Sequence, residues 1–185
     1  MIGPRSVETR QLLLRAPTPA DVDALFEVQG DPDAMLHTYH APDRDATARY
    51  LEAYRARFAE DGFAPWTVVL QEEGRVIGWG GLNRDPKEPH WGCEVSYFIH
   101  PGYWGRGLAT ELVHASLDLA FNQIGLAELL AFTRPANHGS RRVLEKSGFA
   151  FVRHVPELER DRYSVDPHRW DDAIRSRPRR RSRHR

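Results

Sequence analysis

The feature that most restricts the fold of this chain is a glycine-rich turn between a strand-like run and a long amphipathic helix. The turn is Gly102-Tyr-Trp-Gly-Arg-Gly107, with glycines spaced G-x-x-G-x-G. Residues 91–99 before it are rich in β-forming side chains, and residues 108–124 after it repeat apolar side chains at helical spacing. Glycine lets a backbone approach a ligand closely and adopt positive φ. Because the first amides of a helix lack intrahelical acceptors, this turn is suited to binding phosphate.

Two other classes of phosphate-binding loop are excluded by the same residues. A Walker loop ends in Lys-Ser or Lys-Thr, which is missing here. A dinucleotide fingerprint follows the first strand of a βαβ series and precedes an acidic strand end, and neither condition is met. Arg106 adds a cationic side chain for a phosphate oxygen. A tight turn without any ligand stays open as the alternative.

Hydrophobic periodicity and turn residues predict the other elements of the chain. We expect strands at 11–15, 66–70, 75–82, 91–99, 126–133, 150–155 and 162–165. We expect helices at 19–29, 45–60, 108–124 and 137–147, and a turn of helix at 168–174. The order of these elements predicts one mixed α/β layered domain at 1–174. Residues 175–185 are expected to form a basic, disordered C-terminal tail.

Composition limits the class of protein. The chain has 185 residues, about the size of one domain, and its single cysteine, Cys93, excludes an intrachain disulfide. No apolar run reaches the roughly 18 residues of a membrane span, and the first ten residues lack a signal-peptide core. We therefore expect a cytoplasmic protein. The zero net charge hides seven arginines at 175–185, so the rest of the chain has 19 Lys and Arg against 26 Asp and Glu.

The residues around the glycine turn resemble the GNAT acyltransferases. More narrowly, they resemble the branch of ribosomal-protein N-terminal (alanine/serine) acetyltransferases. The most specific match is His100-Pro-Gly-Tyr-Trp-Gly-Arg-Gly-Leu-Ala-Thr-Glu111, followed by Asn137-His-Gly-Ser-Arg-Arg-Val-Leu-Glu-Lys-Ser-Gly-Phe149. The resemblance covers residues 10–170. It implies a central mixed, mostly antiparallel sheet flanked by helices, and an N-acetyltransferase that uses acetyl-CoA and no metal.

The resemblance also implies where the donor binds. The turn and helix start hold the pyrophosphate of acetyl-CoA, the end of the preceding strand pairs by backbone with the pantetheine arm, and Ser140 lies near the sulfur. The implied donor-binding residues are Phe98, Ile99, Gly102, Trp104, Gly105, Arg106, Gly107, Leu108, Ala109, Asn137 and Ser140. Many family members have Gln or Arg where this chain has Gly102, so a side-chain contact is lost here but the backbone cradle is intact. Typical members have Leu where this chain has Ser147, and we interpret that difference as neutral.

Three side chains are candidates for the chemistry. Attack of a neutral amine on a thioester needs a group that removes an ammonium proton, a donor for the oxyanion and a group that protonates the thiolate. Glu94 matches a glutamate that acts as the base in similar enzymes, and a surface carboxylate is the alternative. Ser140 is the candidate that protonates the leaving thiolate or donates a hydrogen bond to its sulfur, and a role in local helix structure is the alternative. Tyr97 is the third candidate, and ordinary packing in the strand is the alternative. The resemblance implies that the Ile99 N–H polarises the carbonyl.

The acceptor stays open between a protein N-terminal α-amine and a small-molecule amine. Trp91 is a candidate border of the acceptor site. A non-catalytic acyl-CoA-binding module is the rival hypothesis. A nucleic-acid-binding protein that contacts RNA or the ribosome through the basic tail is a second rival, disfavoured by the acidic body. The scattered histidines, including His37 and His40, match no metal motif. The sequence leaves monomer and homodimer open.

Overall fold

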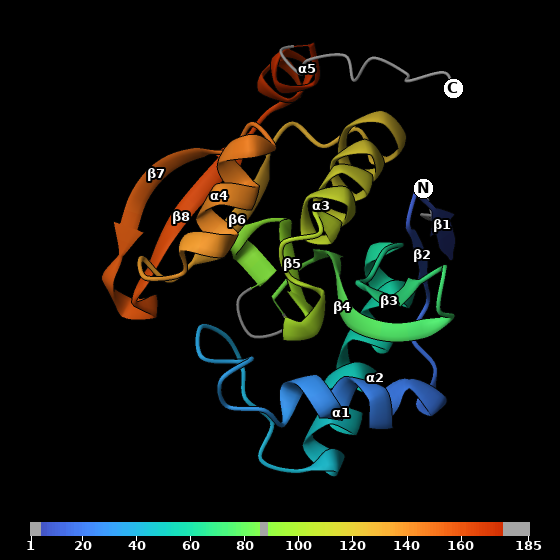
Figure 1. Cartoon of the computed structure of the whole chain (residues 1–185). Coiled ribbons are helices and arrows are strands. Elements are labelled where there is room, and N and C mark those ends of the chain that lie inside the picture. Colours follow the sequence, from blue (N-terminus) through green and yellow to red (C-terminus); the bar gives the residue numbers. More distant parts are fainter. Residues whose placement is uncertain (1–4, 86–88, 176–185) are drawn as a thin grey trace, which may run out of the picture.

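The computed structural model describes residues 5–85 and 89–175. In this part of the chain, eight strands form one sheet with helices on both faces (Figure 1). The strands are β1 Ser6–Glu8, β2 Leu12–Arg15, β3 Trp66–Leu70, β4 Arg75–Asn83, β5 Glu94–Ile99, β6 Leu129–Thr133, β7 Ala150–Val155 and β8 Arg160–Val165. The helices are α1 Val22–Gln29, α2 Arg44–Asp61, α3 Leu108–Asp118, which continues as a π-helix at Leu119–Ile124, α4 His138–Lys146 and α5 Pro167–Arg175.

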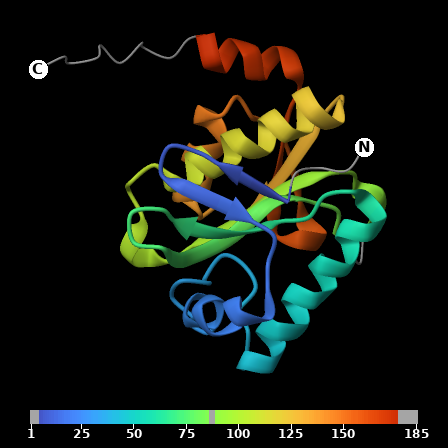
Figure 2. The ribbon, with the colours of Figure 1, turned by 90° about the vertical axis from the view of Figure 1, so that its right-hand side faces the viewer.

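Two layers of helices enclose the sheet. Figure 2 shows α1 and α2 on one side of it and α3 to α5 on the other. Successive side chains of a strand point to opposite faces. Phe98 of β5 accordingly packs with Val22 and Leu25 of α1, whereas Val95 belongs to the core that includes Leu112 of α3. We call the two sides the α1–α2 face and the α3–α4 face.

The sheet is divided at its centre by a splay between β5 and β6. The strand order is β1-β2-β3-β4-β5-β6-β8-β7, and every neighbouring pair is antiparallel except β5 and β6. Over their described lengths, these two parallel strands share a single register pair, Glu94 with Leu130. The Leu130 N–H donates to the Cys93 carbonyl at 3.0 Å. Beyond this point the strands separate, which opens the middle of the sheet.

The predicted fold class is confirmed, and several boundaries are corrected. β5 begins at Glu94 instead of residue 91 because its partner β4 ends at Asn83, which pairs with Glu94. β6 begins at Leu129 instead of residue 126 because Leu129 faces Val165, the last residue of β8. β1 was not predicted, since its three residues form a strand only by pairing with β2. The expected final turn is the helix α5, in which Trp170 is buried.

The ends of α4 follow the sequence pattern closely. Asn137 Oδ1 accepts the Ser140 N–H at 3.0 Å, as an N-cap does. At the other end Gly148 has φ 90° and donates to Glu145, while the Phe149 N–H donates to Leu144 at 3.1 Å. These bonds form the predicted Schellman motif. The caps hold Ser140 in the first turn of the helix.

None of the helices in the described ranges has the length and apolar run needed to cross a bilayer. Apart from Arg175, which ends α5, the expected basic tail lies outside the described residues.

A buried ion pair ties α1 to the sheet and yields a stability prediction. Asp21 is 3% exposed and accepts Arg15 Nη1 and Nη2 at 2.8 and 2.6 Å and Thr67 Oγ1 at 3.0 Å. Burial alone would raise the pKa of Asp21, but the bonds from Arg15 and Thr18 bring it below its usual value. We expect Asp21→Ala to lower the free energy of unfolding by about 3–5 kcal/mol, because it leaves a cation without its partner.

Urea unfolding at pH 7 measures this effect. The matched control is Asp23→Ala, which removes an exposed partner of Arg44 and should leave the midpoint unchanged. Since the pKa of Asp21 is lowered by folding, its contribution is complete above its unfolded pKa and is lost as the pH falls through the folded value. Equal midpoints for the two variants at pH 7 would contradict the assignment.

Candidate functional site

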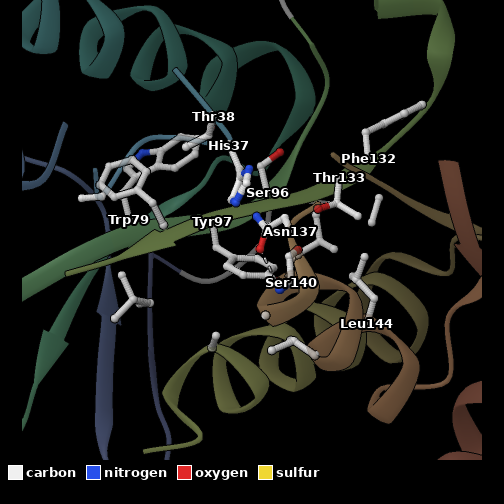
Figure 3. A pocket seen from close by; sticks show the side chains of 18 of the residues that line it. His37, Thr38, Trp79, Ser96, Tyr97, Phe132, Thr133, Asn137, Ser140 and Leu144 are labelled. Atoms are coloured by element: carbon white, nitrogen blue, oxygen red, sulfur yellow. Dashed lines mark hydrogen bonds between the residues drawn. The ribbon is translucent and has the colours of Figure 1, made fainter. Parts of the chain in front are cut away.

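A cleft with a volume of about 1340 Å³ runs through the splay between β5 and β6. Single-ligand pockets usually have about 300–1,000 Å³, so this cleft has room for more than one small ligand. Figure 3 shows side chains that reach it from both faces of the sheet. Asn137 and Ser140 come from the α4 end, and His37 and Thr38 come from the chain between α1 and α2.

One end of the cleft is the glycine turn before α3. Gly105 and Gly107 have φ of 78° and 81°, in the left-handed region, and a Cβ on either would have no atom within 4 Å. The first helical bond of α3 runs from the Glu111 N–H to Gly107 at 3.0 Å. The amides of Leu108, Ala109 and Thr110 precede that bond, so they have no acceptor inside the helix. The turn is therefore an open cradle of backbone donors that fits a pyrophosphate.

Three residues of the turn have contacts that the sequence did not predict. The Gly102 N–H donates to His100 Nδ1 at 3.0 Å, and Gly102 is absent from the described lining of the cleft. The Arg106 guanidinium is paired with Glu72 and also lies outside the lining. Trp104 Nε1 donates to the Ile99 carbonyl at 2.7 Å. A phosphate contact by Arg106 would thus have to replace the ion pair with Glu72.

The backbone groups of β5 point alternately to β4 and to the splay. The His100 N–H donates to Ile77 at 2.7 Å, and Phe98 is in register with Trp79. Because bonded and non-bonded residues alternate in an antiparallel pair, the Phe98 amide groups point to β4, and those of Tyr97 and Ile99 point to the splay. The Phe98 ring also stacks on Trp79, with centroids 5.7 Å apart. The Ile99 N–H is therefore directed to the splay, whereas the Phe98 backbone groups bond to β4, and both residues line the cleft.

Tyr97 and Ser140 meet on the α3–α4 face of the cleft. The Tyr97 hydroxyl lies 3.1 Å from Ser140 Oγ, and the two form a hydrogen bond (Figure 3). Burial raises the pKa of Tyr97 to about 12. Tyr97 therefore keeps its proton at neutral pH, so the pair can donate a proton or a hydrogen bond to a group in the cleft.

Glu94 lies on the opposite face of the same strand. The Ser96 hydroxyl donates to Glu94 Oε1 at 3.0 Å, and Asn83 Nδ2 donates to the Ser96 hydroxyl oxygen at 2.8 Å. Burial raises the pKa of Glu94 to about 7, against the opposing hydrogen bond from Ser96 and with a further increase from Asp85. Glu94 is thus not the exposed surface carboxylate of the alternative interpretation. A carboxyl with a pKa near 7 is suited to act as a general base at neutral pH.

An aromatic wall faces Glu94 across the cleft. Tyr50 and Tyr54 of α2 lie with their ring centroids 4.9 Å apart, and each contacts Trp79 of β4, at 5.2 and 4.9 Å. All three rings line the cleft. Flat rings beside a carboxyl form a surface that is complementary to an amine in its cationic form.

Comparison with known proteins decides the family. The model of the acetyltransferase (GNAT) domain matches residues 11–150 of the chain. The chain belongs to the GNAT acetyltransferase family. It is accordingly an acyl-CoA-dependent acetyltransferase.

Bacterial proteins are among those similar to this GNAT acetyltransferase. YoaA of Bacillus subtilis, named an uncharacterized N-acetyltransferase, is 25% identical over 146 residues, which cover 77% of this chain and 81% of YoaA. An acetyltransferase structure from Agrobacterium tumefaciens is 25% identical and superposes with a TM-score of 0.76, covering 89% of this chain and 96% of the other. The ribosomal-protein-S5-alanine acetyltransferase of Vibrio fischeri, 18% identical, shares the fold with a TM-score of 0.70, covering 89% and 98%.

The GNAT structure brings most of the predicted site residues to one cleft. Glu94, Tyr97, Asn137 and Ser140 all line it. Trp91 is not part of the described lining and instead packs on Phe132, a lining residue, with centroids 5.7 Å apart.

The partners of Glu94 and the aromatic wall were not predicted from the sequence. Ser96 lies two residues from Glu94 and therefore on the same strand face, which was a usable signal. Tyr50 and Tyr54 are four residues apart on one helix, but only the packing of α2 on β4 directs them to the cleft.

Proposed function

We propose that this enzyme transfers an acetyl group from acetyl-CoA to a primary amine by direct attack. The observation that carries the proposal is the continuity of the cleft. It joins the amide cradle at the start of α3, the Tyr97–Ser140 pair and Glu94 through one opening in the sheet. The acceptor and the donor would therefore meet in the splay, with a proton acceptor on one face and a proton donor on the other.

The donor site is proposed from the open backbone groups. The amides from Gly105 to Ala109 would hold the pyrophosphate, and the splay-facing amides of Tyr97 and Ile99 would pair with the pantetheine arm. Asn137, whose side chain caps α4, lines the same channel. When bound, acetyl-CoA supplies the activated acetyl thioester. The Ile99 N–H points to the splay, where it could polarise the carbonyl of that thioester.

Glu94 is the proposed base. Its carboxylate, held by the Ser96 hydroxyl, would remove a proton from the acceptor ammonium directly or through a water molecule. The amine must be neutral to attack, so this step precedes transfer. Because the pKa of Glu94 is about 7, both of its protonation states are accessible near neutral pH. The surrounding rings of Tyr50 and Tyr54 would bind the ammonium before it loses the proton.

The Tyr97–Ser140 pair is the proposed acid. Tyr97 is protonated at neutral pH and is bonded to Ser140, so one hydroxyl can pass a proton to the leaving thiolate while the other replaces it. The nitrogen loses its second proton to water as the amide forms, and the pair regains its proton from water. Positioning of the two substrates in the cleft supplies the rest of the rate increase. Cys93 is buried and has no part in this scheme, because direct attack needs no covalent enzyme intermediate.

Release of the free thiol of CoA tests this proposal. The full chain is mixed with acetyl-CoA and a panel of primary amines, including alanyl and seryl peptides, and the thiol is measured with a colorimetric reagent. We expect amine-dependent release and an acetylated product by mass spectrometry. Binding of acetyl-CoA without transfer to any amine would favour the acyl-CoA-binding module instead.

Removal of either hydroxyl from the acid pair should lower kcat and leave donor binding intact. For Tyr97→Phe and Ser140→Ala we expect losses of about 10- to 100-fold in kcat with little change in the KM for acetyl-CoA. The double variant should lose little more than the worse single variant, because the two groups act as a unit. Tyr163→Phe is the control: this buried hydroxyl accepts a bond from Arg141 outside the described lining. Fully additive losses would argue against a shared proton.

A further inference from the structure

Arg160 is one of the arginines in the cleft that the proposed reaction does not use. Arg160, the first residue of β8, is half-buried and lines the same cleft as Glu94. Two nearby arginines have carboxylate partners: Arg134 pairs with Glu159 at 3.9 Å and Arg162 with Glu128 at 3.7 Å. Arg160 forms no such pair with a described residue. A partly buried guanidinium without a carboxylate in contact is incompletely compensated.

The register of the sheet puts Arg160 on the acceptor side. Glu94 pairs with Leu130, and Leu130 pairs with Ser164 of β8, so these three side chains share one face. Arg160 is four residues from Ser164, an even number, and therefore points to the same α1–α2 face. It is also close enough to Glu94 for the two charges to interact. Tyr97 and Ser140 lie on the other face, away from Arg160.

We infer that Arg160 binds an anionic group of the acceptor, which would be an amine that also carries a carboxylate, such as a free α-amino acid. This inference rests on the proposed function, because it assumes that the amine is the group that reaches Glu94. An amino acid presents its ammonium and its carboxylate to the two opposite charges that the cleft offers. A guanidinium is the side chain best suited to a carboxylate, since two N–H groups match its two oxygens. The rings of Tyr50 and Tyr54 then face the rest of the acceptor.

The alternative role for Arg160 is that of a counter-ion for Glu94. In that case its loss would affect every acceptor equally, because the base itself would be changed. In our interpretation the effect depends on the acceptor: only amines with a carboxylate lose affinity. The two roles therefore differ in a measurable selectivity.

Binding and transfer are measured together with matched ligands. Phenylalanine is compared with phenethylamine, which lacks the carboxylate, and with phenylalanine amide, which keeps the shape without the charge. Calorimetry gives the affinities in the presence of CoA, and thiol release from acetyl-CoA gives kcat and KM. We expect wild type to bind phenylalanine about 10-fold or more tightly than either analogue. We expect Arg160→Gln to weaken the binding of phenylalanine by about 10- to 100-fold and that of the analogues by less than about 2-fold.

Two further variants complete the test. Arg160→Lys keeps the charge and should recover part of the lost affinity. Arg162→Gln, on the same strand and face but paired with Glu128, should behave like wild type. Equal affinity of wild type for the three ligands, or an equal effect of Arg160→Gln on all three, would overturn the inference. Selective binding without any acetyl transfer would support the role of Arg160 and contradict the proposed function, so the two failures are distinguishable.

Discussion

Glu94→Gln is expected to lower kcat/KM for the amine by about 10²- to 10⁴-fold at pH 8, the usual contribution of a positioned general base. The wild-type kcat/KM should rise as the pH increases and level off above about 7, because the pKa of Glu94 is about 7 and only the carboxylate accepts a proton. The variant should lack that inflection. Steady-state rates from pH 5.5 to 9 at low amine concentration measure both effects.

The same substitution should stabilise the fold at high pH. Folding raises the pKa of Glu94, so its contribution to stability is complete below the unfolded pKa and is lost as the pH rises through about 7. At pH 8 the wild type holds a half-buried carboxylate that glutamine avoids, and we expect Glu94→Gln to be more stable by about 1–3 kcal/mol. At pH 5 the two proteins should unfold at similar denaturant concentrations.

Glu111→Gln is the control for the pH dependence. This carboxylate accepts the Gln11 N–H at 2.6 Å and bonds from Thr9 and Gln11 side chains, so it anchors α3 outside the reaction. Its removal should lower stability without moving the kinetic inflection. A full rate with an unchanged inflection in Glu94→Gln would mean that another group, or water alone, takes the proton.

Gly107→Glu is expected to abolish binding of acetyl-CoA. Gly107 has φ 81° and immediately precedes the open amides of α3, so a glutamate there adds a negative charge at the proposed pyrophosphate site. At about 100 times its dissociation constant, acetyl-CoA should raise the free energy of unfolding of wild type by about 2.7 kcal/mol. The variant should show no such increase. Thermal unfolding with and without acetyl-CoA measures the difference.

Backbone strain has to be separated from the loss of binding. A non-glycine residue at positive φ destabilises the fold by itself. Gly125→Glu is the matched control, because Gly125 has φ 79° and equally open surroundings. Gly125 caps the C-terminal end of the helix formed by α3 and the π-helix, whereas Gly107 caps its N-terminal end. Both variants should unfold earlier than wild type, and only the Gly125 variant should respond to acetyl-CoA. A full response in Gly107→Glu would place the pyrophosphate elsewhere.

Local chemistry made parts of this protein predictable. The turn at Gly105 and Gly107 and the caps of α4 depend on residues within a few positions of one another, and they form as predicted. Strand ends were less predictable, because a strand ends where its partner does. Glu94 opens β5 only because Asn83 closes β4.

The sequence by itself determined the family, the glycine turn before α3 and the residue types of the candidate site. It could not determine which side chains of β5 lie on which face of the sheet, since a shift of one residue in the pairing register moves every side chain to the opposite face. The tertiary structure decided that Glu94 and Tyr97, three residues apart, lie on opposite faces of a splayed sheet. It also decided that Arg160, far along the chain, shares the face of Glu94. Such pairings depend on packing between segments that are distant in the sequence, and local sequence patterns do not predict the energies of that packing.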